Sequence, residues 1–406
     1  MSRASEKLLA FVLVAAVAFT GGTVRFRASG TAAGDTSRAP ATESVTRLPA
    51  PTADTATTPA LSGGEDGGET VPAGIGTVTE PVETAAPSPT PEPKQAETYS
   101  LHFVGDCTLA CNAYYQGGPL GYDTVVGDDY AYPFAKTIQY FAGDDFTFAN
   151  LEVALTESDY YVDKTFRFKT HAEYARVMTE GSVEFVGLAN NHVLDYGEEG
   201  YADTKAAVEA VGLSYAGRDE WAIYETDRGM KIGVYAVSFG SSAQIKAGVE
   251  AVKAAGAEFV IAALHFGDEG SYQVNADQMT AARAAVDAGA DFVYGSHPHT
   301  LQPYELYNGV YIFYSMGNWT FGGNTDPRDK DTLILHLTVQ QDPDGSVAVT
   351  DMEIIPCACS GTAQGNNFQP VPYEPGTEEY DRTLSKLDGS FTGQNLSIGY
   401  GYSAHE

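Results

Sequence analysis

The stretch that decides the fold is Val186-Gly187-Leu188-Ala189-Asn190-Asn191-His192-Val193-Leu194-Asp195-Tyr196-Gly197. The apolar run from 183 to 189 predicts a buried strand, which ends in two amides, an imidazole and a carboxylate before a helical pattern begins. Ligands of α/β proteins bind at the carboxyl ends of strands. We therefore take this strand end as the first part of a candidate site.

Other apolar runs end in the same way. They finish in Gly105-Asp106, in Asn150-Leu151-Glu152, in His265-Phe266-Gly267 and in Gly295-Ser296-His297-Pro298-His299. Each polar residue alone has an ordinary explanation as a turn, cap or surface residue. Repetition at the end of every run favours one shared site. Carboxylates, an amide oxygen and imidazoles are the ligands that hard to borderline divalent cations bind, so we predict a metal site.

Composition limits the function. The chain has 406 residues, of which 43% are hydrophobic, and this is enough for a sizeable core. The formal net charge of -31 argues against a nucleic-acid partner, because there is no basic stripe to neutralise phosphates. An anionic substrate would need a metal or local cations to hold it.

The N-terminal residues 1–27 contain Arg3 and Lys7 followed by an apolar run, which favours a signal peptide or an uncleaved membrane anchor. Both alternatives place the rest of the chain outside the cytoplasm. Residues 28–97 are rich in Pro, Thr and Ala and almost lack aromatic residues, so we predict a disordered linker or stalk.

The cysteines are few and lie in two close pairs. An even, sparse count in an exported chain predicts one or two disulfides, linking Cys107 or Cys111 to Cys357 or Cys359. A zinc knot is the alternative, although the spacings are not those of common structural zinc sites.

Residues 98–360 read as one α/β domain in which strands alternate with helices. The predicted helices are 132–141, 172–179, 201–211, 243–255 and 275–288. The later strands, 310–314, 333–339 and 346–355, suggest a second and more antiparallel sheet. Residues 361–406 read as a loosely packed C-terminal tail with one helix at 376–387.

The motifs in this order resemble a known family. Gly105-Asp106, Asn150-Leu151-Glu152, Asn190-Asn191-His192, His265-Phe266-Gly267, Gly295-Ser296-His297-Pro298-His299 and Tyr314-Ser315-Met316-Gly317-Asn318 look like the ordered motif set of the bacterial capsule synthesis protein CapA family, also called the poly-γ-glutamate capsule family. That family resembles the calcineurin-like metallophosphoesterases. The resemblance implies a four-layer α/β/β/α sandwich with one or two divalent metals at strand ends, for which Mn, Fe, Zn and Mg are all compatible.

The resemblance also implies roles for individual residues. Asp106 and His299 would bind the first metal, Glu152 would bridge, and Asn191, His265 and His297 would bind the second. His192 would be the acid that protonates a leaving oxygen. Asp195 would either orient His192 or cap the next helix. The phosphoesterase pattern has Asp-x-His on the first strand, whereas this chain has Asp106-Cys107-Thr108, so the first metal site is one imidazole short.

Some residues have two interpretations. Asn150, Gln302 and Asn318 fit substrate contacts in the family pattern, and core or turn packing is their alternative. The basic cluster Lys164, Arg167 and Lys169 fits contact with an anionic substrate or an ordinary amphipathic strand.

Two classes of function follow from this reading. The first is an extracytoplasmic metal-dependent hydrolase of a phosphoester or amide bond in an anionic cell-surface polymer or its precursor, with poly-γ-glutamate as the family's typical polymer. The second is a non-catalytic component that binds a polyanion within membrane-bound capsule synthesis machinery. A surface scaffold that has lost its metals is a third alternative.

Overall fold

The computed structural model describes residues 23–26, 46–49, 95–113 and 116–396. Most of the predicted signal or anchor, 1–27, and of the predicted linker, 28–97, lies outside these ranges. Among the residues that are described, no helix is long and apolar enough to cross a membrane.

The first sheet carries the first three motif strands. Its order is β1 (Thr23–Phe26), β17 (Val347–Ala358), β16 (Asp331–Gln341), β3 (Glu97–Thr108), β4 (Phe146–Leu151), β7 (Phe185–Gly187) and β8 (Ser214–Ala216), with β15 (Asn318–Phe321) beside β3 and β18 (Val371–Pro372) beside β17. Strands β3, β4, β7 and β8 run parallel, so the polar residues after β3, β4 and β7 lie at one edge.

The second sheet carries the remaining motif strands. Its order is β13 (Tyr304–Tyr307), β14 (Val310–Phe313), β12 (Phe292–Ser296), β11 (Phe259–His265), β10 (Lys231–Ser238), β9 (Glu220–Glu225) and β2 (Thr46–Pro49). Because β10, β11 and β12 are parallel, His265 and the loop after Ser296 also reach a common edge. A separate short pair joins β5 (Ala154–Leu155) to β6 (Lys169–Thr170).

The two sheets pack face to face through one hydrophobic core. Alternation along β3 turns Leu101 and Phe103 into this core, where the Phe103 ring lies 4.5 Å from that of Phe292 in the second sheet. Nearer the site, the Tyr294 hydroxyl donates a 2.8 Å hydrogen bond to the Val104 carbonyl across the interface. The contact aligns the strand ends of both sheets.

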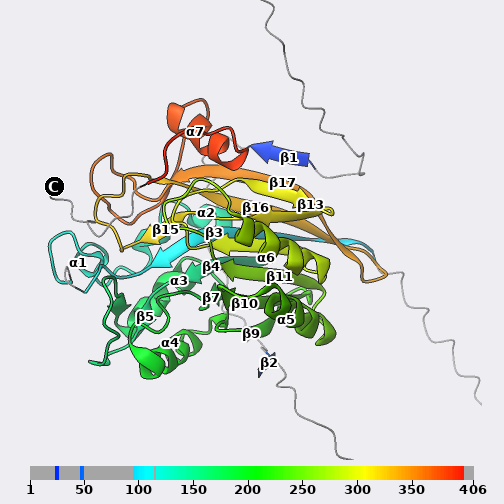
Figure 1. Cartoon of the computed structure of the whole chain (residues 1–406), viewed down its shortest axis with the longest axis horizontal. Helices are drawn as coiled ribbons and strands as arrows, with labels where there is room; N and C mark the ends of the chain where they lie inside the picture. Colours follow the sequence, from blue (N-terminus) through cyan, green and yellow to red (C-terminus); the bar gives the residue numbers. More distant parts are fainter. Residues whose placement is uncertain (1–22, 27–45, 50–94, 114–115, 397–406) are drawn as a thin grey trace, which may run out of the picture. The chain divides into compact units, whose positions relative to one another are not determined.

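Helices cover the outer faces (Figure 1). On the first sheet these are α1 (Tyr122–Val126), η1 (Tyr132–Phe134), α2 (Ile138–Phe141), η2 (Ala172–Ala175), α3 (Arg176–Glu180) and α4 (Gly197–Ala210). On the second sheet they are α5 (Ser242–Ala254) and α6 (Ala276–Asp287), each begun by a capping box, at Ser241 and Asn275. The four-layer α/β/β/α sandwich is thus confirmed.

Two sequence predictions about the later strands and the basic segment are corrected. The run 310–314 joins the second sheet as predicted, but β16 and β17 extend the first sheet, because the apolar residues of β16 pair with β3, with Leu335 opposite Phe103. The basic segment is mostly irregular, and only Lys169–Thr170 is a strand.

The C-terminal segment carries a helix, α7 (Glu378–Leu387), close to the predicted limits. Its Lys386 is buried, and the ammonium lies 2.7 Å from carboxylate oxygens of both Asp329 and Asp331. Arg382 of the same helix pairs with Asp331 at 2.7 Å. The helix is therefore held to the start of β16 by buried ion pairs.

Candidate metal centre

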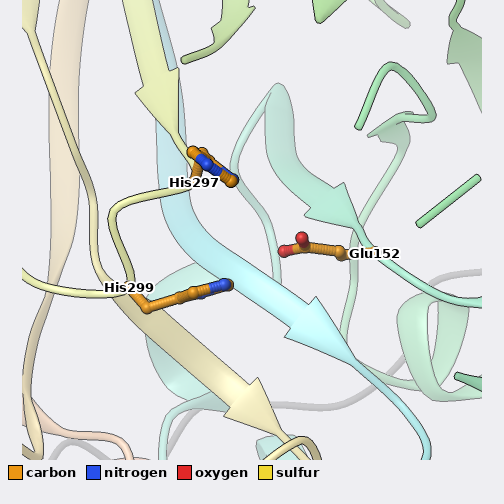
Figure 2. Close-up of side chains that lie close together, drawn as sticks. All are labelled: Glu152, His297 and His299. Atoms are coloured by element: carbon orange, nitrogen blue, oxygen red, sulfur yellow. The ribbon is translucent and has the colours of Figure 1, made fainter. Parts of the chain in front are cut away.

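The predicted ligands converge where the strand ends of both sheets meet. Glu152, His297 and His299 offer ligand atoms that all lie within 4.8 Å of one another, and Asp106, Glu152 and His265 form a second such group. Figure 2 shows Glu152, from the loop after β4, pointing toward the two imidazoles that follow β12. Glu152 belongs to both groups, so the arrangement suits two adjacent cations that share one carboxylate.

The carboxyl group of Glu152 is fully buried, and neither oxygen has a hydrogen-bond partner among the described residues. Burial, followed by the negative charge of Asp106, raises its pKa well above the usual range. The nearest ring nitrogens lie 3.6 Å away on His265 and 4.0 Å away on His192. Buried polar atoms are normally paired, so two unpaired oxygens fit an ion-binding role.

Asp106 is oriented by neighbours on three sides. One oxygen accepts a 2.8 Å hydrogen bond from the side-chain amide of Asn150. The other accepts from the His297 backbone N–H at 3.4 Å and lies 3.3 Å from Nδ1 of His299. The resemblance implied that Asp106 and His299 bind the same metal, and this contact agrees with that pairing. The two groups of ligand atoms differ from it, because they place His299 with His297 and Asp106 with His265.

The imidazoles differ in their protonation. Burial lowers the pKa of His265 well below its usual range and that of His297 to about 3. For His299 burial also acts downward, but Glu152 and Asp106 outweigh it and raise the pKa to about 10. Nδ1 of His297 has no hydrogen-bond partner within the described ranges. Neutral rings with a free nitrogen are suited to bind metal.

The residues Asn191 and Ser296 hold His265. Its Nε2 lies 2.9 Å from the Asn191 side-chain oxygen, and its Nδ1 lies 2.9 Å from the Ser296 hydroxyl. A hydrogen bond to the second ring nitrogen fixes the orientation of a ligand histidine. Ser296 was in a quoted motif but had no predicted role, since the sequence does not show which side chain reaches the imidazole.

His192 and Asp195 form a buried pair. Nδ1 of His192 lies 2.8 Å from Oδ2 of Asp195, while the helix that follows is not capped by Asp195. Burial lowers the pKa of His192, and Asp195 acts in the opposite direction. Of the two roles considered for Asp195, the geometry supports orientation of His192.

Lys164 supports the same pair from the loop between β5 and β6. Its ammonium forms an ion pair with Oδ1 of Asp195 and donates a 2.9 Å hydrogen bond to the Asn191 carbonyl. The backbone N–H of Phe168 donates to Oδ2 of Asp195 at 2.9 Å. Lys164 was predicted only as part of a basic cluster, because no sequence signal links it to Asp195 across 31 positions.

Three residues predicted to contact substrate form hydrogen bonds within the protein, as their alternative role in packing requires. Asn150 bonds Asp106, and Asn318 bonds the His299 ring at 2.9 Å and its carbonyl at 3.2 Å. Gln302 is fully buried and bonds Gln278 and the Ser271 carbonyl. Sequence placed these amides near the site but could not show the direction of their side chains.

Arg167 is also turned to the protein. Its guanidinium carbon lies 3.9 Å from the centre of the Tyr161 ring, and the residue is buried. Contact of Arg167 with an anionic substrate stays a prediction.

The disulfide prediction is wrong for this structure, in which Cys107, Cys111, Cys357 and Cys359 are all buried free thiols. Strand β16 lies between β3 and β17, so the strands of Cys107 and Cys357 are two spacings, or about 10 Å, apart. A disulfide needs Cα atoms closer than about 7 Å. Burial raises the pKa of Cys359 to about 12.

Comparison with known proteins places this centre in a family. Residues 100–323, more than half of the chain, match the family described as "Bacterial capsule synthesis protein PGA_cap". The PGA biosynthesis protein CapA of Bacillus subtilis (strain 168) is 30% identical over 284 residues, which cover 64% of this chain and 72% of that protein. The capsule biosynthesis protein CapA of Bacillus anthracis is 28% identical over 261 residues, covering 56% and 61%.

A solved structure, the NAD nucleotidase NadN of Haemophilus influenzae, aligns with 73% of this chain and 63% of its own, at 14% identity and a TM-score of 0.37. That overlap is too low for any functional comparison. The sequence match and the capsule biosynthesis relatives are sufficient by themselves: the chain belongs to the bacterial capsule synthesis protein PGA_cap family.

Proposed function

We propose that this protein is a metal-dependent hydrolase that cleaves a phosphoester or amide bond in an anionic cell-surface polymer or its precursor. Membership of a capsule synthesis family supports the polymer, and the curated relatives are named for PGA and capsule biosynthesis. One observation carries the proposed chemistry. Glu152, a buried carboxylate with no hydrogen bond among the described residues, is shared by two groups of candidate ligands and lies 4.0 Å from His192.

The residues present fit one or two divalent ions. Asp106, Glu152, Asn191, His265, His297 and His299 would hold them, and the bound ions would supply polarisation of the scissile bond and activated water. Asp195 binds Nδ1 of His192, so Nε2 would take up a proton from the attacking water and give it to the leaving atom. Asn318 and Ser296 would keep His299 and His265 in position.

The second candidate is a non-catalytic component that binds a polyanion through one metal. Its support is the first strand, where Cys107 and Thr108 stand in place of a further imidazole and the Cys107 thiol lies 3.7 Å from the Gly105 carbonyl. The first candidate explains more of the site, because a binding site has no evident need for an oriented His192–Asp195 pair.

The proposal includes a location and partners. We propose that the protein acts outside the cytoplasm, secreted or attached to the membrane by residues 1–27, and that it works beside membrane-bound capsule synthesis proteins. The composition of residues 1–97 supports a leader followed by a spacer. Protease protection of the protein in intact cells and in spheroplasts would test this placement.

Elemental analysis of the purified full-length protein tests the chemistry, with phosphodiester and γ-glutamyl substrates assayed on the same samples. We expect metal at one to two equivalents, loss of metal in Asn191→Ala and His299→Ala, and turnover of one substrate class. His171→Ala is the matched control, because this histidine is exposed and its side chain pairs with the exposed Glu157, away from the candidate ligands. One equivalent of metal without turnover would favour the polyanion-binding candidate, and a metal-free protein would exclude both.

A further inference from the structure

A pocket opens beside the candidate metal ligands and has no role in the proposal above. It is lined by Phe166, Phe168, His192, Glu269, His299, Phe321 and Gly323. The Phe168 ring lies 4.6 Å from that of His192, and the Phe321 ring lies 4.8 Å from that of His299. Three phenyl rings therefore surround a space next to the candidate proton donor, where a leaving group would be expected.

Glu269 is the charged residue of this pocket that belongs to neither group of ligands. It is half-buried, and across residues 95–113 and 116–396 its carboxylate forms no ion pair within 4.0 Å and no hydrogen bond, although its negative charge helps to raise the pKa of His299. A partly buried carboxylate without a partner is costly, and a ligand of opposite charge would lower that cost.

The nearby cations of the protein do not fill this role once metal is bound. His299, whose pKa Glu269 helps to raise, is a cation only in the metal-free protein and would be a neutral ring as a metal ligand. Lys164 is paired with Asp195, and Arg167 is stacked on Tyr161. The pocket thus combines phenyl rings, whose faces attract cations, with a negative carboxylate that repels anions.

We propose that the pocket formed by Phe166, Phe168, Phe321 and Glu269 binds an organic cation, an alkylammonium group on the part of the substrate next to His192. The pocket would contact the alkyl chain through its rings and the ammonium through Glu269. This inference rests on the proposed function in one respect, because it takes the alkylammonium group to be part of the substrate of the hydrolase.

Three probes of similar size and different charge test the proposal: n-pentylammonium, 1-pentanol and pentanoate. Each is titrated by NMR into the metal-loaded full-length protein. We expect n-pentylammonium to bind at least fivefold more tightly than 1-pentanol, whereas any binding of pentanoate would report contact of a carboxylate with the adjacent metals. Equal binding of the ammonium and the alcohol, or no binding of either, would each overturn the proposal.

Glu269→Gln should remove the preference for the ammonium while leaving affinity for 1-pentanol and the metal content unchanged. Asp268→Asn is the matched control, since it makes the same change in charge at an adjacent exposed residue whose carboxylate bonds Asn275. If Glu269→Gln still preferred n-pentylammonium to 1-pentanol, the assignment of the ammonium to Glu269 would be wrong. Turnover assays on the same samples distinguish the proposed pocket from the proposed hydrolase activity. Binding of the ammonium without turnover would contradict the hydrolase activity and support the pocket.

Discussion

At the scale of single residues, the site is defined by which buried charges have partners. Asp106 accepts hydrogen bonds from Asn150 and from the His297 backbone, whereas Glu152 accepts none within the described residues. Leaving such a group unsatisfied costs about 1–3 kcal/mol or more. Two carboxylates and several imidazoles this close are thus expected to be more stable with a bound cation than without one.

Because the pKa of His299 is raised, we expect metal binding to release a proton. In the metal-free protein its pKa is raised to about 10, so the ring is protonated at pH 8 and must lose the proton to become a ligand. The apparent metal affinity should therefore rise with pH below 10, and Glu152, whose pKa is also raised, adds to this rise where it is protonated. Calorimetry in buffers of different ionisation enthalpy measures the released protons.

His299→Gln should release about one proton fewer than the wild type at pH 8, and His171→Ala should match the wild type. An unchanged proton count together with an unchanged metal affinity in His299→Gln would show that this ring is not a ligand.

We expect Lys164 to hold His192 in position through its ion pair with Asp195. Lys164→Met removes the ion pair to Asp195 and the hydrogen bond to the Asn191 carbonyl. We expect kcat to fall about tenfold, equivalent to about 1.4 kcal/mol, with KM nearly unchanged. Lys164→Arg should recover most of kcat, because a guanidinium can donate to the same oxygens.

The control for Lys164 is Lys169→Met, which removes a lysine that donates instead to the Ser158 carbonyl. A rise in KM with constant kcat in Lys164→Met would assign this lysine to substrate binding instead. Equal losses in both variants would indicate a general effect of charge.

At the scale of elements, close packing of backbones brings the strand ends together. A Cβ atom on Gly105 would lie 2.1 Å from the Gly317 carbonyl oxygen, and one on Gly295 would lie 2.2 Å from that of Tyr314. Asp106 also donates its backbone N–H to the Gly317 carbonyl at 2.9 Å. These glycines are required where one strand approaches the next at the edge that carries the ligands.

Sequence predicted this edge well because parallel strands place their ends together, and apolar runs that end in polar residues mark those ends. It could not assign β16 and β17 to a sheet, since strand pairing depends on which edge is free. It also missed the partners of Gln302 and Lys164, which are set by the tertiary fold. Close pairs of cysteines suggested disulfides, but their strands are kept apart by β16.

Helix α7 predicts a large loss of stability when its buried lysine is removed. Lys386→Met leaves Asp329 and part of Asp331 without a counter-charge in a buried environment. We expect the free energy of unfolding to fall by about 3–5 kcal/mol, measured by urea denaturation. Arg176→Ala is the control, because its exposed pair with Glu180 contributes at most about 0.5 kcal/mol.

The same ion pairs set a dependence on pH. Burial acts to raise the pKa of Asp331, but Arg382 and Lys386 outweigh it, and the net pKa is below its usual value of 3.8. A carboxyl group with a lowered folded pKa stabilises the fold above the unfolded pKa, and this contribution disappears as pH falls through the folded value. The loss in Lys386→Met should therefore shrink below pH 4, and a loss that stayed constant would contradict the ion-pair explanation.

At the scale of the whole molecule, the charge balance opposes the function that the family suggests. The full chain carries a formal charge of -31, and its Asp and Glu residues outnumber Lys and Arg by 54 to 23. A surface of this sign repels a long polyanion, so such a substrate would bind through the metal centre or by one end. The negative charge also repels itself within the folded protein, and that repulsion can be measured.

Monovalent salt should stabilise the protein at pH 7 because it screens this repulsion. Raising KCl from about 20 mM to about 500 mM reduces the Debye length from roughly 20 Å to roughly 4 Å. We expect Tm to rise by at least about 3 °C, which for a folded domain of this size corresponds to about 2 kcal/mol. At pH 4.4, near the sequence pI, the net charge is close to zero and the rise should vanish. NaCl is the control for specific binding of K⁺, since its cation differs in size but screens equally well. A rise seen with KCl alone, or one that persisted at pH 4.4, would assign the stabilisation to bound ions instead of to relief of the overall negative charge.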